Sequence, residues 1–466
     1  MAPTTVLEGL LTPEQEKTYV HLPFDVPENV ARLDVTFEYS DRIGSDPRLT
    51  GGNTIDLGVF GEAGVDFLHA GFRGWSGSER DRFFITPSEA TPGYLAGPIG
   101  AGRWHLLLGL YKIAPHGCRY RAEITVTAGE GAQVVLERRP ACGDLPSSPP
   151  PAPYAPWLRG ELHCHTHHSD GVYSPAELVA LARERGMDFL AVSDHNTTAA
   201  QRELETLENP GLVLIRGVES TTFRGHFNVW GIPDWVDFRV ETPEQMRSAV
   251  AFANDRGAVT SCGHPKPLGP NWEYEDVNNP HCVEVWNGPW NGLNEISLAY
   301  WVRQIDAGRQ VAAVGGSDYH RPGEQAGGME RQIGTPTNWV PVEGDPSPQA
   351  ILAAIRAGRA CVSDTPDGPL LDLRAGDGLP ARAGDALTRP PGGELPVRVR
   401  VLRGAGCRLI LFDQSGECWS ALLETEDESV SARIPTGQSL YLRAELRTPE
   451  GWMRALTNPV YLQGAE

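Results

Sequence analysis

The sequence predicts an α/β domain at the centre of the chain with an all-β region on each side. Between residues 157 and 366, short apolar runs alternate with segments that carry helix start and stop signals, as in a parallel sheet with crossover helices. On both flanks, apolar and polar residues alternate one by one, as in half-buried strands. Since 466 residues exceed what one core normally serves, we expect more than one domain.

The first flank is expected to be a β-sandwich-like domain over residues 1–145. Residues 33–37 and 120–126 alternate apolar and polar side chains, so one face of each strand would be buried. Residues 146–156 are rich in proline, which is typical of a semi-rigid linker. The linker therefore separates this domain from the central one at 157–366.

The central domain repeats a strand-to-helix pattern. Ser174-Pro-Ala-Glu177 is a capping box with proline at the first helical position, and Gly186 ends that helix. Further helices are expected at 242–257, 293–310 and 347–358, and buried strands at 187–192, 212–215, 258–261 and 311–314. Functional groups of such folds collect at the carboxyl ends of the strands.

The last flank, residues 367–466, is expected to be a small β domain. Its three clearest strand patterns lie at 395–401, 408–412 and 440–446.

Metal-ligand residue types follow the apolar runs of the central domain. His163 and His165 are two apart on an expected strand, so both imidazoles leave the same face and can meet one cation. The candidate ligands are His163, His165, Asp170, His195, Glu219, His226, His264, Asp318 and His320. Imidazole and carboxylate bind borderline divalent cations, and carboxylates can bridge neighbouring cations. Nine ligands suit two or three ions, for which manganese, zinc and iron are all acceptable.

With these motifs, the region from Trp157 to about Asp364 resembles the polymerase and histidinol phosphatase (PHP) family of metallohydrolases, and within it the carbaryl-hydrolase-like branch. The resemblance implies a distorted (β/α)7 barrel with its metals at the carboxyl ends of the strands. The two β domains would flank this barrel.

The resemblance also implies how the ligands divide. One ion would be held by His163, His165, Glu219 and Asp318. Glu219 would bridge to a second ion that also takes His226 and His264, and a third would take Asp170, His195 and His320. Asp194, Glu284 and Asn287 are expected to orient these ligands.

The net charge of the protein and the charge of the metal site limit which substrates are expected. A net charge of −20 speaks against a long nucleic acid as the main partner, because such binding draws on a basic surface. Three divalent ions would leave the site with an excess of about +2, which favours a small anionic phosphate ester. With two ions that excess vanishes, and a neutral carboxylic or carbamate ester becomes equally plausible.

The expected activity is phosphoester hydrolysis of a small phosphodiester or phosphomonoester by a metal-bridging hydroxide, with Glu219 as the bridging ligand and Asp318 accepting the proton. Lys266 and Arg321 are candidates for contacts with the phosphate. The alternatives are a carboxylic or carbamate ester hydrolase, and a non-catalytic protein whose β domains bind a carbohydrate or protein.

The location of the protein is expected to be cytoplasmic and away from membranes. No apolar run reaches the length of a membrane span, and the first residues lack the basic and apolar parts of a signal peptide. The eight cysteines are scattered without a Cys-x-x-Cys pair, which favours reduced thiols. The sequence does not predict an oligomeric state.

Overall fold

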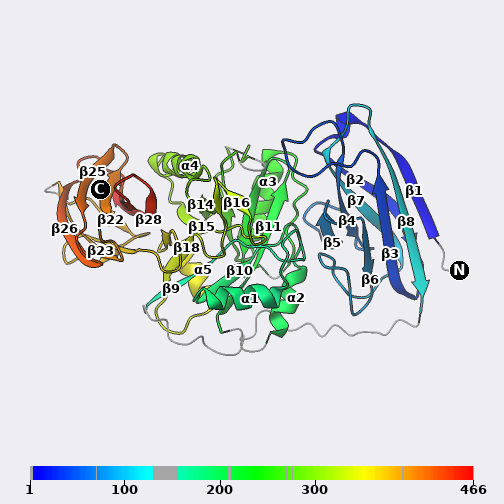
Figure 1. Cartoon of the computed structure of the whole chain (residues 1–466), viewed down its shortest axis with the longest axis horizontal. Coiled ribbons are helices and arrows are strands. Elements are labelled where there is room, and N and C mark those ends of the chain that lie inside the picture. Colours follow the sequence, from blue (N-terminus) through cyan, green and yellow to red (C-terminus); the bar gives the residue numbers. More distant parts are fainter. Residues whose placement is uncertain are drawn as a thin grey trace.

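The computed structural model describes residues 4–69, 71–129, 156–207, 211–232, 234–267, 271–274, 276–390 and 393–464. Three parts follow one another along the long axis, with the two chain termini at opposite ends (Figure 1). We name them the N-terminal β region (4–129), the central α/β region (156–366) and the C-terminal β region (367–464). Most of the predicted linker, 146–155, lies outside the described residues. No described helix combines the length and apolar character that crossing a membrane requires.

The N-terminal β region consists of two antiparallel four-stranded sheets that share one hydrophobic core. The first sheet has the order β1 (Thr4–Leu11), β8 (Cys118–Ala128), β3 (Val30–Tyr39) and β6 (Arg82–Ile85). The second has the order β2 (Tyr19–Val26), β7 (Gly102–Lys112), β4 (Thr54–Phe60) and β5 (Phe72–Gly77), and a single 3-10 turn spans Pro13–Gln15. The predicted strands at 33–37 and 120–126 lie within β3 and β8.

The described part of the central α/β region contains five helices and a sheet in which the first seven strands lie in chain order and the last two lie on the other side of the first. The helices are α1 (Pro175–Glu184), α2 (Ala199–Thr206), α3 (Pro243–Asn254), α4 (Asn294–Asp306) and α5 (Pro348–Arg356). The strands are β9 (Trp157–Glu161), β10 (Phe189–Val192), β11 (Val213–Thr222), β12 (Gly225–Trp230), β13 (Val259–Cys262), β14 (Cys282–Asn287), β15 (Ala312–Gly316), β18 (Thr337–Pro341) and β19 (Cys361–Ser363). A small hairpin of β16 (Gln325–Ala326) and β17 (Met329–Glu330) stands apart. The expected capping box is present, because Ser174 accepts from the Glu177 amide and Glu177 accepts from Ser174.

The alternation of strand and helix is broken at β11 and β12. β9, β10 and β11 are parallel, but β11 then turns directly into antiparallel β12. Glu219 and His226 consequently lie inside a hairpin, whereas the sequence predicts Glu219 just beyond the end of a strand. The difference arises because residues 216–222 are mostly polar, so the apolar run that predicts the strand ends at residue 215.

Strand β15 lies at an edge of the sheet, and β18 lies between β9 and β19. No ladder joins them in the described residues, but the Asn338 side chain on β18 accepts from the Gly315 amide at 2.8 Å and donates to the Gly315 carbonyl at 2.7 Å. A side chain therefore replaces backbone pairing at this point. The (β/α)7 barrel stays a prediction.

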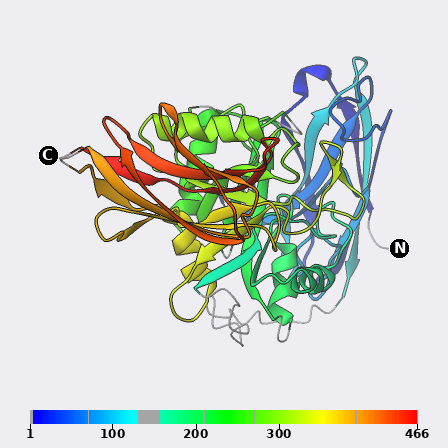
Figure 2. The same cartoon turned by 60° about the vertical axis from the view of Figure 1, so that its left-hand side comes forward.

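The C-terminal β region shares a sheet with the central α/β region. β19 pairs with β28, so the sheet crosses the expected boundary at 366/367 and comes forward in the turned view (Figure 2). The strands are β20 (Leu370–Ala375), β21 (Ala381–Arg382), β22 (Ala386–Thr388), β23 (Glu394–Leu402), β24 (Arg408–Asp413), β25 (Gly416–Leu422), β26 (Asp427–Pro435), β27 (Tyr441–Arg447), β28 (Met453–Thr457) and β29 (Val460–Gln463).

Asn458 fastens the C-terminal β region to the central one. Its fully buried carboxamide accepts from the Ala313 amide and donates to the carbonyls of Ala313 and Ala360.

We expect Asn458→Ala to lower the free energy of unfolding by about 3 kcal/mol, because buried backbone groups lose their partners. Urea unfolding checks this, with Asn278→Ala at an exposed position as the control. Equal stability of the two variants would contradict this role.

Candidate metal centre

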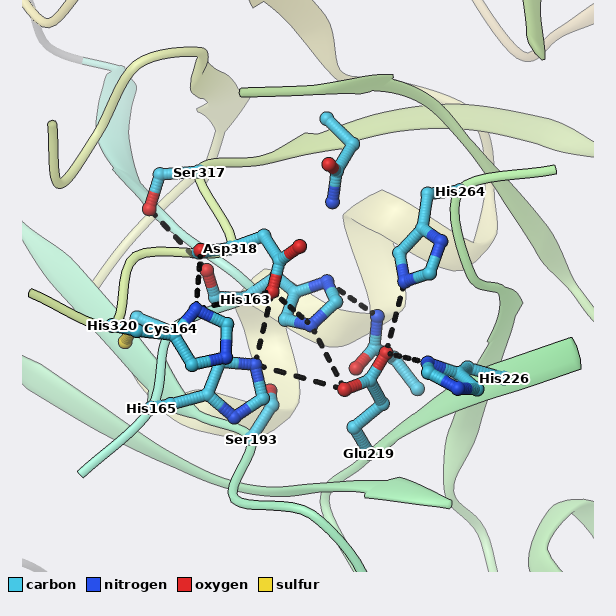
Figure 3. A network of polar contacts seen from close by, with 12 residues as sticks. His163, Cys164, His165, Ser193, Glu219, His226, His264, Ser317, Asp318 and His320 are labelled. Atoms are coloured by element: carbon cyan, nitrogen blue, oxygen red, sulfur yellow. Dashed lines mark hydrogen bonds and ion pairs between the residues drawn. The ribbon is translucent and has the colours of Figure 1, made fainter. Parts of the chain in front are cut away.

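The two histidines of the His-x-His motif follow β9 and point into a common centre (Figure 3). Both side chains are fully buried. His163 Nε2 lies 3.5 Å and His165 Nε2 lies 3.1 Å from Asp318 Oδ1, although Asp318 is more than 150 residues away. Asp318 has φ 53°, a left-handed conformation that a non-glycine residue adopts at some cost and that is common at functional sites.

Glu219 is the hub of the centre. Its Oε2 lies 3.3 Å from His163 Nε2, 3.6 Å from His165 Nε2 and 2.8 Å from His195 Nδ1. Its Oε1 lies 3.0 Å from His226 Nδ1 and 3.2 Å from His264 Nε2. The two oxygens thus face two different groups of imidazoles, which is the arrangement that a bridging carboxylate requires.

The β11–β12 hairpin supplies four polar side chains from one face. Glu219 is paired with Asn228 and Thr221 with His226, so all four point the same way. Asn228 lies 3.1 Å from His163 Nδ1, and Thr221 Oγ1 lies 2.6 Å from His195 Nδ1. The hairpin therefore both supplies ligands and orients their neighbours.

A third group of candidate ligands lies beside the first. Asp170 Oδ1 is 3.6 Å from His195 Nε2 and 3.3 Å from His320 Nε2. The rings of His195 and His320 stack on His165 with centroid separations of 4.3 and 4.1 Å. The structure therefore brings all nine predicted ligands together, and three groups, His163/His165/Glu219, Glu219/His226/His264 and His165/Asp170/His195/His320, each have atoms close enough to share one ion.

The buried carboxylates shape the charge of the centre. Burial would raise the pKa of Glu219, but His163 and His226 hold it well below its usual range. Burial disfavours the protonated form of His195, yet Asp170 and Glu219 raise its pKa to about 9. His320 behaves in the same way beside Asp170. The carboxylates stay ionised and favour nearby positive charge.

The donor set fits divalent cations. The buried atoms His163 Nε2, Asp170 Oδ1, Glu219 Oε2, His226 Nε2 and His264 Nδ1 have no hydrogen-bond partner within the described part of the chain. Buried polar atoms rarely lack partners, so unpartnered nitrogen and oxygen atoms within one group of side chains fit a site for cations. Nitrogen and carboxylate oxygen are suitable ligands for manganese, zinc or iron.

Three further carboxylates hold the ligands in place, of which Asp194 and Glu284 were predicted. Glu284 accepts from His163 Nδ1 at 2.8 Å and from the His264 amide at 2.9 Å, so one carboxylate positions two ligands. A side chain at Gly316 would reach within 2.4 Å of both Glu284 and His163, which requires glycine there. Asp194 accepts from the side chains of Thr166 and Ser169.

Glu161 was missed by the sequence analysis. It is fully buried and accepts from the amides of His163, Ser317 and Gly334, which joins the ends of three chain segments at the site. The position of this carboxylate at the end of β9, two residues before His163, is the signal that could have identified it.

The two predicted phosphate contacts lie in different surroundings. The Lys266 side chain is 1% exposed and donates to Asn287 O at 2.7 Å and Asn294 Oδ1 at 2.8 Å. Burial lowers the pKa of Lys266 to about 7. Arg321 is exposed at the rim and donates to the Asp170 carbonyl at 2.8 Å.

Arg331 is a cation of the site that the sequence analysis missed. Its Nη1 lies 3.4 Å from Asp318 Oδ2 and donates to the Ser317 carbonyl at 2.7 Å, and the side chain is 9% exposed. No motif surrounds this arginine in the sequence, so only the folded chain connects it with Asp318.

We expect Glu284→Gln to weaken metal binding by about 10- to 100-fold, because the His163 ring loses its charged partner. Titration with Mn²⁺, followed by the electron paramagnetic resonance signal of the free ion, measures this. Glu273→Gln, at an exposed position, is the control. Equal affinities of the two variants would argue against a positioning role for Glu284.

Curated proteins match short stretches of the sequence. A 5'-3' exoribonuclease of Haemophilus influenzae is 48% identical over 63 residues, which is 13% of this chain and 23% of that protein. The 5'-3' exoribonuclease Rnm of Escherichia coli is 44% identical over 70 residues, 14% of this chain and 24% of that protein. The chain therefore spans about a quarter of the length of these curated relatives.

Solved structures also align with the chain, at low identity and low TM-score. A two-domain protein of Bacteroides vulgatus, whose name mentions a PHP-like metal-dependent phosphoesterase, has a TM-score of 0.35 and 16% identity, and covers 65% of this chain and 95% of its own. A protein of Bifidobacterium adolescentis, named for a metal-dependent phosphoesterase, has a TM-score of 0.27 and 19% identity, with coverage of 37% and 91%.

A domain profile also matches the chain. Residues 161–261 match the PHP domain, and this segment contains the predicted ligands from His163 to His226 but not His264, Asp318 or His320. The carbaryl-hydrolase-like branch stays a prediction. The match to the PHP domain covers residues 161–261, within the central α/β region, and agrees with the predicted resemblance over that segment.

Proposed function

We propose that this protein is a metal-dependent hydrolase, and that it acts as a phosphoesterase on a small phosphodiester or phosphomonoester. The observation that carries the proposal is the Glu219 carboxylate, whose two oxygens face five imidazoles at 2.8–3.6 Å. The PHP domain match over residues 161–261 supports the same conclusion.

The proposed metal ligands are the nine residues of the sequence analysis. Bound divalent ions would lower the pKa of water to about 7 and polarise the phosphoryl oxygens. Glu219 would hold neighbouring ions together, and Glu284 would keep the His163 ring in the orientation that leaves Nε2 facing the centre. The number of ions, two or three, decides whether the site carries a positive excess for an anionic substrate.

Asp318 is the proposed proton acceptor. Burial would raise its pKa, but Arg331 and His163 hold the pKa of Asp318 well below its usual range, so the side chain stays a carboxylate. Its Oδ1 faces His163 and His165, and its Oδ2 faces Arg331. The exposed Arg321 guanidinium at the rim is the proposed first contact for an incoming phosphate.

RNA is a second candidate substrate. Proteins named 5'-3' exoribonucleases match 63 and 70 residues of this chain at 48% and 44% identity. These matches conflict with the exclusion of long nucleic acid that the net charge of −20 suggested. The net charge describes the whole protein surface, whereas the end of an RNA strand would need only the local electrostatic field of the metal centre.

A substrate panel separates the candidates. It contains 4-nitrophenyl phosphate, bis(4-nitrophenyl) phosphate, 1-naphthyl N-methylcarbamate and a 5'-phosphorylated oligoribonucleotide, each with Mn²⁺ or Zn²⁺. We expect the highest kcat/KM for one of the two small phosphoesters. A preference for the carbamate would support the ester-hydrolase alternative, and a preference for the oligoribonucleotide would support the RNA alternative.

We expect Asp318→Asn to lower kcat by about 10²- to 10⁴-fold, the usual contribution of a positioned proton acceptor. The substitution keeps the side chain's size, so circular dichroism and bound metal, measured with excess Mn²⁺, should stay close to those of the unmodified protein. Asp377→Asn, at an exposed position, is the matched control. Turnover by Asp318→Asn within threefold of the control would refute the assigned role.

A further inference from the structure

The N-terminal β region contacts the two loops that carry Asp170 and His195. We propose that this region completes the third ligand group, Asp170, His195 and His320, so that uptake of a third ion depends on its docking to the central α/β region. The inference rests on the metal centre of the proposed function, and the two residues that make the docking contacts, Arg80 and Gly93, lie outside the matched PHP segment.

Arg80 holds the first of these loops. It lies between β5 and β6, and its guanidinium donates to the His167 carbonyl at 2.6 Å and to the Ser169 carbonyl at 3.3 Å. Ser169 directly precedes Asp170. Two bonds from one planar group therefore fix the backbone immediately before a ligand.

Gly93 holds both loops at once. Its amide donates to His168 Nδ1 at 3.1 Å, and its carbonyl accepts from Thr197 Oγ1 at 2.8 Å, two residues after His195. Gly93 has φ 93°, and a side chain there would lie 2.7 Å from the His168 carbonyl and 2.5 Å from the Trp75 carbonyl. The close approach of the two regions thus requires glycine.

His168 belongs to this docking contact. It forms a cluster with His167 and Glu203 that could in principle hold an ion of its own. However, His168 Nδ1 accepts from the Gly93 amide, so Nε2 carries the proton and donates to Glu203 Oε1 at 2.9 Å. Both ring nitrogens are in use, which favours a structural role.

The other ligand groups are anchored differently. Glu161 and Glu284 hold the segments of His163, His264 and Asp318 from within the central α/β region. The loops of Asp170 and His195 are joined to each other by Asp194, and Arg321 and Thr221 hold them from the central α/β region. Unlike the other segments, they also have an outer side that rests on Arg80 and Gly93. Disturbing the docking should therefore affect the third group selectively.

The test is a Mn²⁺ titration of the full chain and of Arg80→Ala and Gly93→Ala, with free Mn²⁺ followed by electron paramagnetic resonance. The unmodified chain should bind three ions. In both variants the dissociation constant of one ion should rise about 10- to 100-fold, while the other two ions bind as before. Retention of those two ions also shows that the central α/β region is folded.

Matched controls separate docking from general damage. Arg82→Ala removes an exposed arginine two residues away, whose ion pair with Asp81 involves neither loop. Gly51→Ala introduces a side chain at φ 86° with nothing within 4 Å, so it reproduces the backbone strain without the clash. Both controls should bind three ions with unchanged affinity.

The inference is overturned if the unmodified chain binds only two ions, or if Arg80→Ala and Gly93→Ala bind three ions normally. Loss of all ions in both variants would also overturn it, because the effect would not be selective. Ion counting needs no turnover, so the proposed function is tested separately. Selective loss of one ion from a chain that hydrolyses no phosphoester would support this inference and refute that function.

Discussion

A buried carboxylate that needs positive charge on both of its oxygens is the constraint on which this structure depends. Glu219 is fully buried, and five imidazoles from four chain segments surround it. An unpaired charge in such a place would cost more free energy than most single interactions provide. The fold must therefore bring cations to Glu219, either as protons on histidines or as bound metal ions.

Further buried carboxylates surround the side chains that face Glu219. Glu161 and Glu284 are each almost inaccessible, and they accept mainly from backbone amides and from His163. These bonds fix the chain where strands end, and they hold the imidazoles in the orientation that cations require. Rigid support of this kind is what a metal centre needs to keep its geometry while substrates exchange.

The three regions of the chain are joined by polar contacts as well as by apolar packing. Asn458 ties the C-terminal β region to the central sheet, and Arg80 and Gly93 tie the N-terminal β region to the ligand loops. Directional bonds define one relative position of two surfaces more narrowly than apolar contact does. The flanking regions therefore belong to the architecture of the site.

The sequence alone was sufficient to select the nine candidate ligands that the fold brings together, the helix that begins at Ser174 and the strand patterns of both flanks. Ligand type, capping and periodicity depend on neighbours along the chain. The hairpin placement of Glu219, the roles of Glu161 and Arg331, and the docking at Gly93 were decided by tertiary structure alone. The hairpin joins two neighbouring strands, but Glu161 meets the Ser317 amide 156 residues away, and the Gly93 amide meets His168 75 residues away. No local pattern specifies which distant backbone group a buried charge will meet.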